Sequence, residues 1–294
     1  MDLQAYRTEV TKEIERTLAR LLPAESAVPI TIHRAMRYSV FAGGKRLRPL
    51  LVVASGESVG GNRETLLHLG SGIEMMHTYS LIHDDLPALD NDDFRRGSPT
   101  CHKMFGEAMA ILAGDGLMTC CYQVLSDLPH LDETIRIAII REIACATGTR
   151  EGMIGGQVVD LESEGKTIEP PTLDYIHRSK TGALLTACTR CGALASRADP
   201  FQLDALTAYG RDIGLAFQIM DDILDVTSTS EALGKTAGKD QKARKATYPA
   251  LYGLQASRLK AQDLCASATT HIEVLGSRAE ALRGLARIII ERSS

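Results

Sequence analysis

The fold is decided by residues 63–93, which read RETLLHLGSGIEMMHTYSLIHDDLPALDNDD. Between Leu67 and Leu81, apolar or small residues recur at intervals of three and four, which is the spacing of one face of an α-helix. The pattern ends at Asp84, and Pro87 stops the helix because its ring blocks the helical hydrogen bond. This stretch predicts a long helix that delivers a group of carboxylates at its end.

The rest of the chain has the same helical character. Its ten prolines separate long proline-free stretches. Hydrophobic residues make up 44% of the sequence and aromatic residues only 4%, so the core is built mainly from aliphatic side chains, which suit helices better than a β-sandwich. We expect one all-α domain over residues 1–294.

Composition excludes several classes of protein. The 33 basic and 37 acidic residues give a net charge of −4, which does not suit a nucleic-acid-binding surface. No apolar run approaches the length of about 18 residues needed to cross a membrane, and the N-terminus lacks the apolar segment of a signal peptide. The seven cysteines are scattered and odd in number, which indicates buried thiols rather than disulfides or a zinc site. We expect a soluble, cytoplasmic protein without a transmembrane segment.

A second acidic cluster lies at residues 218–225, QIMDDILD, again after an apolar helical stretch. Asp221 and Asp225 are four residues apart and therefore share a helix face. Two carboxylates held at such a distance repel by about 4 kcal/mol at an effective dielectric constant of 20, unless a cation lies between them. Oxygen ligands without Cys or His favour Mg²⁺, with Mn²⁺ as an alternative.

Basic residues occur in short groups that match a phosphate ligand. They lie in the glycine-opened segment 43–49 (GGKRLRP), at 95–97 (RRG), at 180–182 (KTG), where we expect another helix to begin, and at Lys235 and Lys239. Arginine offers a planar pair of donors to phosphate oxygens, and glycine lets the backbone approach an anion. Since Mg²⁺ usually takes part of its ligand shell from substrate phosphates, the two kinds of cluster together predict a phosphorylated substrate.

Other catalytic patterns are missing from the sequence. It contains no nucleotide-binding glycine motif, serine-hydrolase elbow or zinc-protease motif. Among the eight histidines, His77 stands out because it lies seven residues before Asp84, on nearly the same helix face. We expect His77 and Asp84 to line one wall of a site.

With these motifs in this order, the sequence resembles the trans-isoprenyl diphosphate synthases, and within that family the bacterial members that form farnesyl diphosphate. The match runs from about Phe41 to Pro249 and comprises six segments: Gly43–Pro49, Asp84–Gly97, Gly156–Asp160, Lys180–Gly182, Gln218–Asp225 and Gly234–Pro249. The resemblance implies an antiparallel helical bundle around a deep central cavity, with the two acidic motifs facing each other across its mouth. It also implies a homodimer and Mg²⁺ as the cofactor.

The resemblance further implies a role for each motif residue. The principal metal ligands are Asp84, Asp90 and Asp221, with Asp85, Asp222 and Asp225 as supporting ligands or their hydrogen-bond partners. Isopentenyl diphosphate is bound by Gly44, Lys45, Arg48, His77 and Arg96. The allylic diphosphate is bound by Arg95, Lys180, Thr181, Gln218 and Lys235, with Lys239 as a further candidate. Catalysis uses Lys180, Thr181 and Gln218, whose oxygens face the allylic carbocation, and Arg292 is a candidate contact for isopentenyl diphosphate.

Product length is expected to depend on Tyr79, five residues before Asp84, and on the adjacent Ser80. A large ring there implies that the product chain stops growing at fifteen carbons. That length is reached by condensation of isopentenyl diphosphate first with dimethylallyl and then with geranyl diphosphate. The alternatives are a geranylgeranyl or geranyl diphosphate synthase of the same family, and more remotely a terpene cyclase or a non-catalytic regulatory subunit. A cyclase needs no isopentenyl site and a regulatory subunit usually lacks one acidic motif, so the two full motifs favour the synthase.

Overall fold

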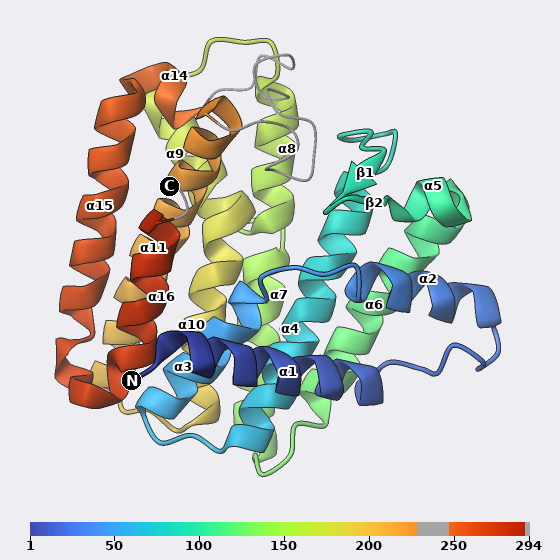
Figure 1. The fold of residues 1–294 in the computed structure, drawn as a ribbon, viewed down its shortest axis with the longest axis horizontal. Helices are drawn as coiled ribbons and strands as arrows, with labels where there is room; N and C mark the ends of the chain where they lie inside the picture. Colours follow the sequence, from blue (N-terminus) through green and yellow to red (C-terminus); the bar gives the residue numbers. More distant parts are fainter. Residues whose placement is uncertain (228–246, 292–294) are drawn as a thin grey trace.

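The computed structural model describes residues 1–227 and 247–291. Helices account for most of them, so the all-α bundle expected from the sequence is confirmed (Figure 1). The only strands in these ranges are the two-residue β1 (Phe94–Arg95) and β2 (Ser98–Pro99), which pair antiparallel. The helices, in chain order, are α1 (Leu3–Leu21), α2 (Ile30–Val40), α3 (Leu47–Ser58), α4 (Arg63–Asp84), α5 (Cys101–Phe105), α6 (Glu107–Ser126), α7 (Glu133–Thr147), α8 (Met153–Ser163), α9 (Pro170–Ile176), η1 (His177–Gly182), α10 (Ala183–Ala195), α11 (Pro200–Thr227), α14 (Tyr248–Tyr252), α15 (Leu254–His271), η2 (Glu273–Ala279) and α16 (Glu280–Glu291).

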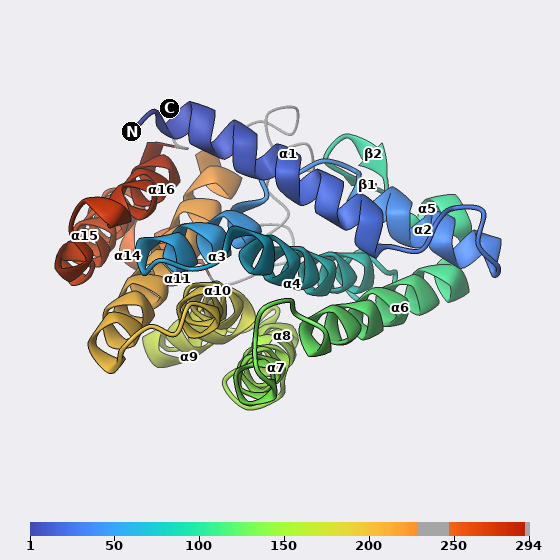
Figure 2. The same ribbon diagram turned by 90° about the horizontal axis from the view of Figure 1, so that it is seen from below.

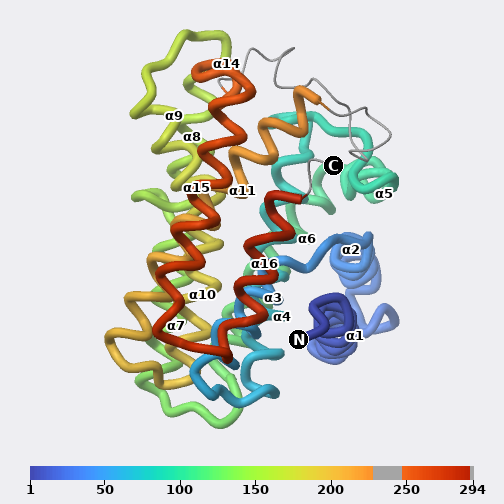
Figure 3. The backbone as a smooth tube through the Cα atoms, turned by 60° about the vertical axis from the view of Figure 1, so that its left-hand side comes forward, coloured from blue at the N-terminus to red at the C-terminus, as the bar shows by residue number. Residues whose placement is uncertain are grey.

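The long helices form a bundle, and α1 and α2 cross it at a steep angle (Figures 1 and 2). Helix α4 packs between α3 and α6, while α11 packs between α10 and α15. Helix α3 also packs on α10, which joins the two halves of the bundle. The tube in Figure 3 shows α15 and α16 running side by side at the C-terminal edge, with the N-terminal α1 beyond α16. The ends of α4 and α11, which carry the two acidic clusters, are thereby held in one framework.

Local sequence accounts for where several helices begin. A side-chain oxygen of Asn62 accepts a hydrogen bond from the Thr65 amide at 3.1 Å, and so caps α4. Asp132 caps α7 in the same way, at 3.0 Å from the Ile135 amide. Each cap satisfies a backbone N–H that the first turn of a helix leaves without a partner.

The predicted helical periodicity is found in the packing. Ile73 and Met76 of α4 are fully buried, as are Ile139 and Ile143 of α7. They belong to one hydrophobic cluster that extends from Val10 to Ile289. The apolar stripe read from residues 63–93 is therefore the core-facing side of α4.

Two sequence expectations need correction. The Lys180–Gly182 motif does not open a helix, because α9, η1 and α10 form one uninterrupted helical segment with a π-helical turn in its middle. Helix α6 is also long and apolar enough to cross a membrane by length and composition, whereas no such run was expected. One such helix is weak evidence for a membrane span, and α6 packs against α4, α2 and α7.

Candidate active site

The first acidic cluster begins where α4 ends. The backbone N–H of Asp90 donates to the carbonyl of Asp84 at 2.9 Å, which folds the following loop back onto the helix end. The pKa of Asp84 is raised to about 6, chiefly by burial and to a smaller extent by the neighbouring Asp90, while the positive charge of Lys180 opposes both. Lys180 of η1 thus acts electrostatically on the end of α4, although the two lie far apart in the sequence.

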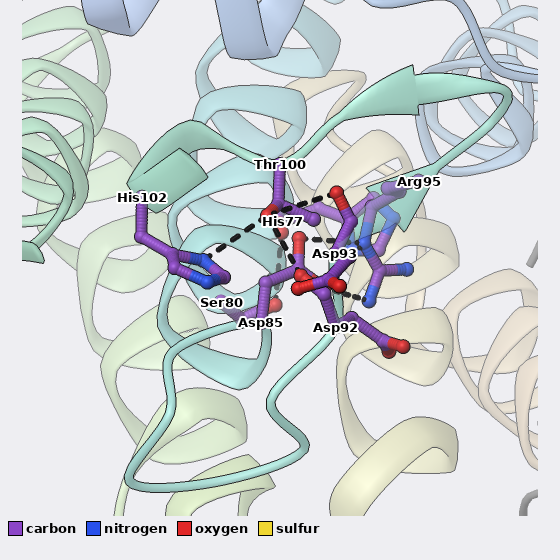
Figure 4. A network of polar contacts seen from close by, with 8 residues as sticks. All are labelled: His77, Ser80, Asp85, Asp92, Asp93, Arg95, Thr100 and His102. Carbon is purple, nitrogen blue, oxygen red and sulfur yellow. Dashed lines mark hydrogen bonds and ion pairs between the residues drawn. The ribbon is translucent and has the colours of Figure 1, made fainter. Parts of the chain in front are cut away.

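Asp85, the next residue in the cluster, holds Arg95. The Arg95 Nε donates to both carboxylate oxygens of Asp85, at 2.8 and 2.9 Å, and Nη2 donates to Oδ1 at 2.6 Å (Figure 4). Asp85 is only 3% exposed. The hairpin that carries Arg95 is secured by Thr100, whose hydroxyl donates to the Asp92 carbonyl at 2.7 Å. The structure therefore places Asp85 as the partner of a predicted diphosphate-binding arginine.

Cationic side chains from two segments, 43–49 and 95–97, act on His77. Burial holds its pKa well below the usual range, and the positive charges of Arg48, Arg96, Arg95 and Arg46 lower it further. An imidazole in this environment is neutral at neutral pH. The concentration of arginines around one side chain forms a region of strong positive potential, as a diphosphate site requires.

Two arginines of the 43–49 segment have different partners. Arg46 is 2% exposed, and its guanidinium group donates to Glu15 at 2.7 Å, to Glu74 at 2.8 Å and to the Val40 carbonyl at 2.7 Å. Arg48 has a buried Nε with no hydrogen-bond partner among the described residues. Arg46 is thus part of the framework, whereas Arg48 retains a buried donor that an anionic ligand would satisfy.

Arg96 lies directly over the glycine loop. Its Nη1 donates to the Gly43 carbonyl. A Cβ atom on Gly44 would lie 2.5 Å from the same nitrogen, so only glycine leaves room for the guanidinium group there. Gly44 also has φ of +130°, a conformation that other residues rarely adopt. The structure thus brings Gly44 and Arg96 together, while Lys45 lies exposed beside them.

Helix α11 carries the second acidic cluster. Asp225 is 7% exposed, and its buried Oδ2 has no hydrogen-bond partner among the described residues. The charge of Asp221 raises the pKa of Arg48, against the larger lowering effect of burial. The charge of Asp221 in α11 therefore affects the pKa of Arg48 in the 43–49 segment, as the charge of Lys180 in η1 affects the pKa of Asp84 in α4. These two charge effects indicate that Lys180 lies near the end of α4 and that Asp221 lies near Arg48.

The predicted residues of η1 contact its neighbours α8 and α11. Lys180 Nζ donates to Asp160 Oδ2 of α8 at 2.7 Å. The Thr181 hydroxyl donates to the Gln218 side-chain oxygen of α11 at 2.7 Å. Asp160 was included in a motif but was given no role from the sequence. Its hydrogen bond with Lys180 shows that the 156–160 and 180–182 segments act together in the structure.

Tyr79 lies at the side of α4 that faces α6. It is 7% exposed, and its ring packs edge-on against His83 with 5.3 Å between centroids. Burial raises its pKa, with smaller contributions from the charge of Asp84 and from Tyr122 and Asp115 of α6. The Ser80 hydroxyl donates to the His77 carbonyl at 2.8 Å, within the helix (Figure 4). Tyr79 is therefore a bulky group between α4 and α6, close to Asp84.

The carboxylates fit a divalent cation. Within residues 1–227 and 247–291, no three His, Cys, Asp or Glu side chains converge to form a metal site by themselves. Mg²⁺ commonly uses only one or two protein carboxylates and completes its shell with water and substrate phosphate. The raised pKa of Asp84 and the unpaired buried oxygen of Asp225 are both relieved by a nearby cation.

Some predicted residues lie outside the described ranges, and one neighbour of the site was missed. Lys235, Lys239 and Arg292 fall outside the described residues. His177 was given no role from the sequence, although its buried Nε2 lies 3.2 Å from Asp222 Oδ2. Its position three residues before Lys180 is the sequence signal that could have identified it.

The chain is similar to known proteins over most or all of its length. Residues 29–280 match the model of the family described as "Polyprenyl synthetase". The chain is 45% identical to farnesyl diphosphate synthase of Escherichia coli (strain K12), with 100% of both chains covered. It is 42% identical to geranylgeranyl diphosphate synthase of Cyanophora paradoxa, covering 100% of this chain and 97% of that protein. The crystal structure of an FPP/GFPP synthase from Zymomonas mobilis superposes with a TM-score of 0.88 at 42% identity, over 98% of this chain and 99% of that one.

Proposed function

Because the chain belongs to the polyprenyl synthetase family, we propose that it condenses isopentenyl diphosphate with dimethylallyl and then geranyl diphosphate, giving farnesyl diphosphate and inorganic diphosphate. The observation that carries the proposal is the pair of electrostatic connections between the two halves of the bundle. Lys180 acts on Asp84, and Asp221 acts on Arg48. They join two acidic clusters and a group of arginines into one site that suits two diphosphates.

Asp84, Asp90 and Asp221 would hold Mg²⁺, or Mn²⁺, in this site. When bound, the cation supplies positive charge that stabilises the departing diphosphate of the allylic substrate. Arg95, oriented by Asp85, and Lys180, oriented by Asp160, add fixed positive charge for the same group. Thr181, Gln218 and Lys235 complete the proposed set of allylic contacts.

The second diphosphate, that of isopentenyl diphosphate, fits the region around His77. The proposed contacts are Gly44, Lys45, Arg48, His77 and Arg96. The buried Nε of Arg48 would gain an acceptor there. His77 would act as a neutral hydrogen-bonding group among the arginines, because its pKa is held low.

Ionisation of the allylic substrate leaves a carbocation, which oxygen atoms stabilise. Thr181 Oγ, the Lys180 carbonyl and the Gln218 side-chain oxygen would supply this stabilisation. The hydrogen bond from Thr181 to Gln218 fixes the relative position of two of these oxygens. The double bond of isopentenyl diphosphate then attacks the allylic carbon, and the released diphosphate accepts the proton whose loss completes the new double bond. The site must exclude water, which would capture the cation.

Tyr79 supports a fifteen-carbon product, with Ser80 beside it as the second residue proposed to set length. A buried aromatic ring between α4 and α6 would stop a chain growing in that direction from the acidic cluster. The alternative of a twenty-carbon product is favoured by the similarity to a geranylgeranyl diphosphate synthase over the whole chain. The two products differ by one condensation and are separated by chromatography after dephosphorylation.

We further propose that residues 1–294 form one domain that functions as a cytoplasmic homodimer. One hydrophobic cluster extends through the described chain, which supports a single domain. Ile111 and Leu112 of α6 are 45% and 50% exposed, and a second copy of the chain would cover such an apolar face. Symmetric dimers are the most common assemblies of identical chains.

The decisive experiment supplies the purified protein with Mg²⁺ and measures diphosphate release and product length. Release that requires both isopentenyl and dimethylallyl diphosphate, with a fifteen-carbon product, supports the proposal. Release from an allylic diphosphate alone indicates a cyclase, and no release from any combination indicates a regulatory subunit. A twenty-carbon main product would show that the protein forms geranylgeranyl diphosphate instead of farnesyl diphosphate.

A further inference from the structure

The segment that carries Lys180 and Thr181 is an unusual piece of helix. Residues 177–182 form a π-helical turn inside a longer helical segment. Such turns are rare and occur frequently at functional sites. Two glycines of neighbouring helices allow it to pack closely. A Cβ on Gly156 would lie 2.3 Å from the backbone nitrogen of Lys180, and one on Gly214 would lie 2.9 Å from the Gly182 Cα.

A chain of hydrogen bonds leads from this turn into the second acidic cluster. Thr181 Oγ1 donates to Gln218 Oε1 at 2.7 Å, and Gln218 Nε2 donates to Asp222 Oδ1 at 2.9 Å. An amide group has one accepting and one donating end, so its orientation matters. Asp222, which only accepts when ionised, directs the Gln218 oxygen towards Thr181.

Asp222 is itself held by the start of the same turn. Its Oδ2 lies 3.2 Å from His177 Nε2 and accepts a hydrogen bond from the Tyr248 amide at 2.8 Å. Asp222 and His177 are 3% and 4% exposed. The His177 ring also stacks on the Tyr248 ring, with 6.1 Å between centroids and 21° between planes. The contacts form a closed circuit from His177 through Asp222 and Gln218 back to Thr181 in the same turn.

We propose that His177 and Asp222 are positioning residues, which fix the orientation of the Gln218 amide so that its oxygen faces Thr181 and the reacting carbon. This inference rests on the proposed function and deepens it. It also separates the carboxylates of the second cluster by role. Both oxygens of Asp222 are engaged by protein donors, whereas Asp225 has a buried oxygen with no partner among the described residues. Asp222 therefore holds the protein framework and does not bind the metal.

The physical consequence of losing His177 follows from this geometry. Without the imidazole, Asp222 Oδ2 keeps only the Tyr248 amide as a donor, and the carboxylate turns more easily. The Gln218 amide can then reverse and present its NH₂ group, which bears partial positive charge, to the carbocation. Such a misorientation slows the chemical step and leaves diphosphate binding intact, because the arginines belong to other segments and Lys180 keeps its own hydrogen bond to Asp160.

The test compares His177→Ala, His177→Gln and Asp222→Asn with the wild-type protein, using geranyl and isopentenyl diphosphates. We expect kcat to fall by about 10-fold to 100-fold in His177→Ala, as small displacements of catalytic groups do. KM for both substrates should stay within about threefold, because ground-state binding is unchanged. Glutamine at 177 can donate through its amide nitrogen and should restore part of kcat. Arg178→Ala, an exposed residue of the same turn, is the matched control and should retain wild-type kcat.

A binding measurement that needs no turnover tests the assignment of Asp222. Mn²⁺ binding in the presence of inorganic diphosphate, measured by equilibrium dialysis, should be nearly unchanged in Asp222→Asn and strongly weakened in Asp221→Asn. Equal weakening in both variants would overturn the proposal, as would a loss of kcat in His177→Ala that excess Mg²⁺ restores. Failure of glutamine to restore any kcat in a folded His177→Gln variant also contradicts it. If the wild-type protein forms no prenyl product, the proposed function fails, and the dialysis result still decides the role of Asp222.

Discussion

Neighbouring residues of α4 have very different environments. His77 lies among arginines, which keep its ring neutral. Tyr79, two positions later, is buried towards α6, and Asp84 at the helix end is a carboxyl group whose pKa is raised to about 6. Tyr79 projects from a different side of α4 than His77 and Asp84, and each of the three can be tested by a single substitution.

Tyr79→Ala should change the main product from fifteen to twenty carbons. Removing the ring opens space between α4 and α6 that a longer chain can fill, and the diphosphate contacts remain. The products are dephosphorylated and separated by chromatography. Thr78→Ala is the control, because Thr78 lies on another face of α4, beside Tyr38, and should leave product length unchanged. An unchanged product in Tyr79→Ala would show that this ring does not limit chain growth.

His77→Gln should reduce the loss of unfolding free energy that the metal-free protein shows as the pH falls below 6.5. The native pKa of His77 lies well below 6.5, so below that pH the unfolded chain binds a proton that the native protein does not. The wild-type protein therefore loses up to about 1.4 kcal/mol of stability for each pH unit below 6.5, relative to the variant. Urea unfolding with EDTA at pH 7.5 and pH 5 measures this. A stability difference between the two proteins that does not change with pH would contradict the low pKa.

The sequence could predict which residue types gather at the site but not every role. Lys45, Arg46 and Arg48 are equivalent cations in one segment when read from the sequence. Only the structure shows Arg46 engaged by Glu15 and Glu74, because those glutamates come from distant helices. Tertiary partners, which local spacing does not encode, decide whether a charge serves the framework or a ligand.

At the scale of elements, helix positions were predictable and the π-turn was not. The spacing between Leu67 and Leu81 and the proline at 87 predict α4 and its end, because these are local effects. The turn at residues 177–182 depends on close contacts with α8 and α11, which local sequence does not show. Glycine at 156 and 214 was its indirect signal, since each permits an approach that a side chain would block.

Gly156→Ala should displace η1 and reduce both stability and activity. Its Cβ would meet backbone atoms of Lys180, which cannot move aside as a flexible side chain can. We expect a loss of about 1–3 kcal/mol, typical of overpacked sites, together with a lower kcat. Urea unfolding and steady-state kinetics measure the two effects. Gly116→Ala is the control, because a Cβ there meets the flexible Met36 side chain at 3.1 Å. Wild-type behaviour of Gly156→Ala would show that the close contact is not required.

At the scale of the whole molecule, the bundle brings together segments separated by more than a hundred residues. The sequence indicated two acidic clusters and several basic groups, but their convergence follows from how α3, α4, η1 and α11 pack. The same packing leaves one face of α6 uncovered. Ile111 and Leu112 are about half exposed on that face. A partner surface explains why a helix so apolar has an exposed side.

The paired substitution Ile111→Glu and Leu112→Glu should therefore convert a dimer to a monomer. Two carboxylates buried without partners at a subunit interface cost several kcal/mol, which exceeds what a moderate interface can offset. Sedimentation velocity should give the mass of two chains for the wild-type protein and of one chain for the variant. Phe201→Glu, which changes an apolar residue that is 81% exposed on α11, is the control and should remain dimeric. A wild-type protein that is monomeric and co-floats with phospholipid vesicles would instead assign the α6 face to a membrane surface.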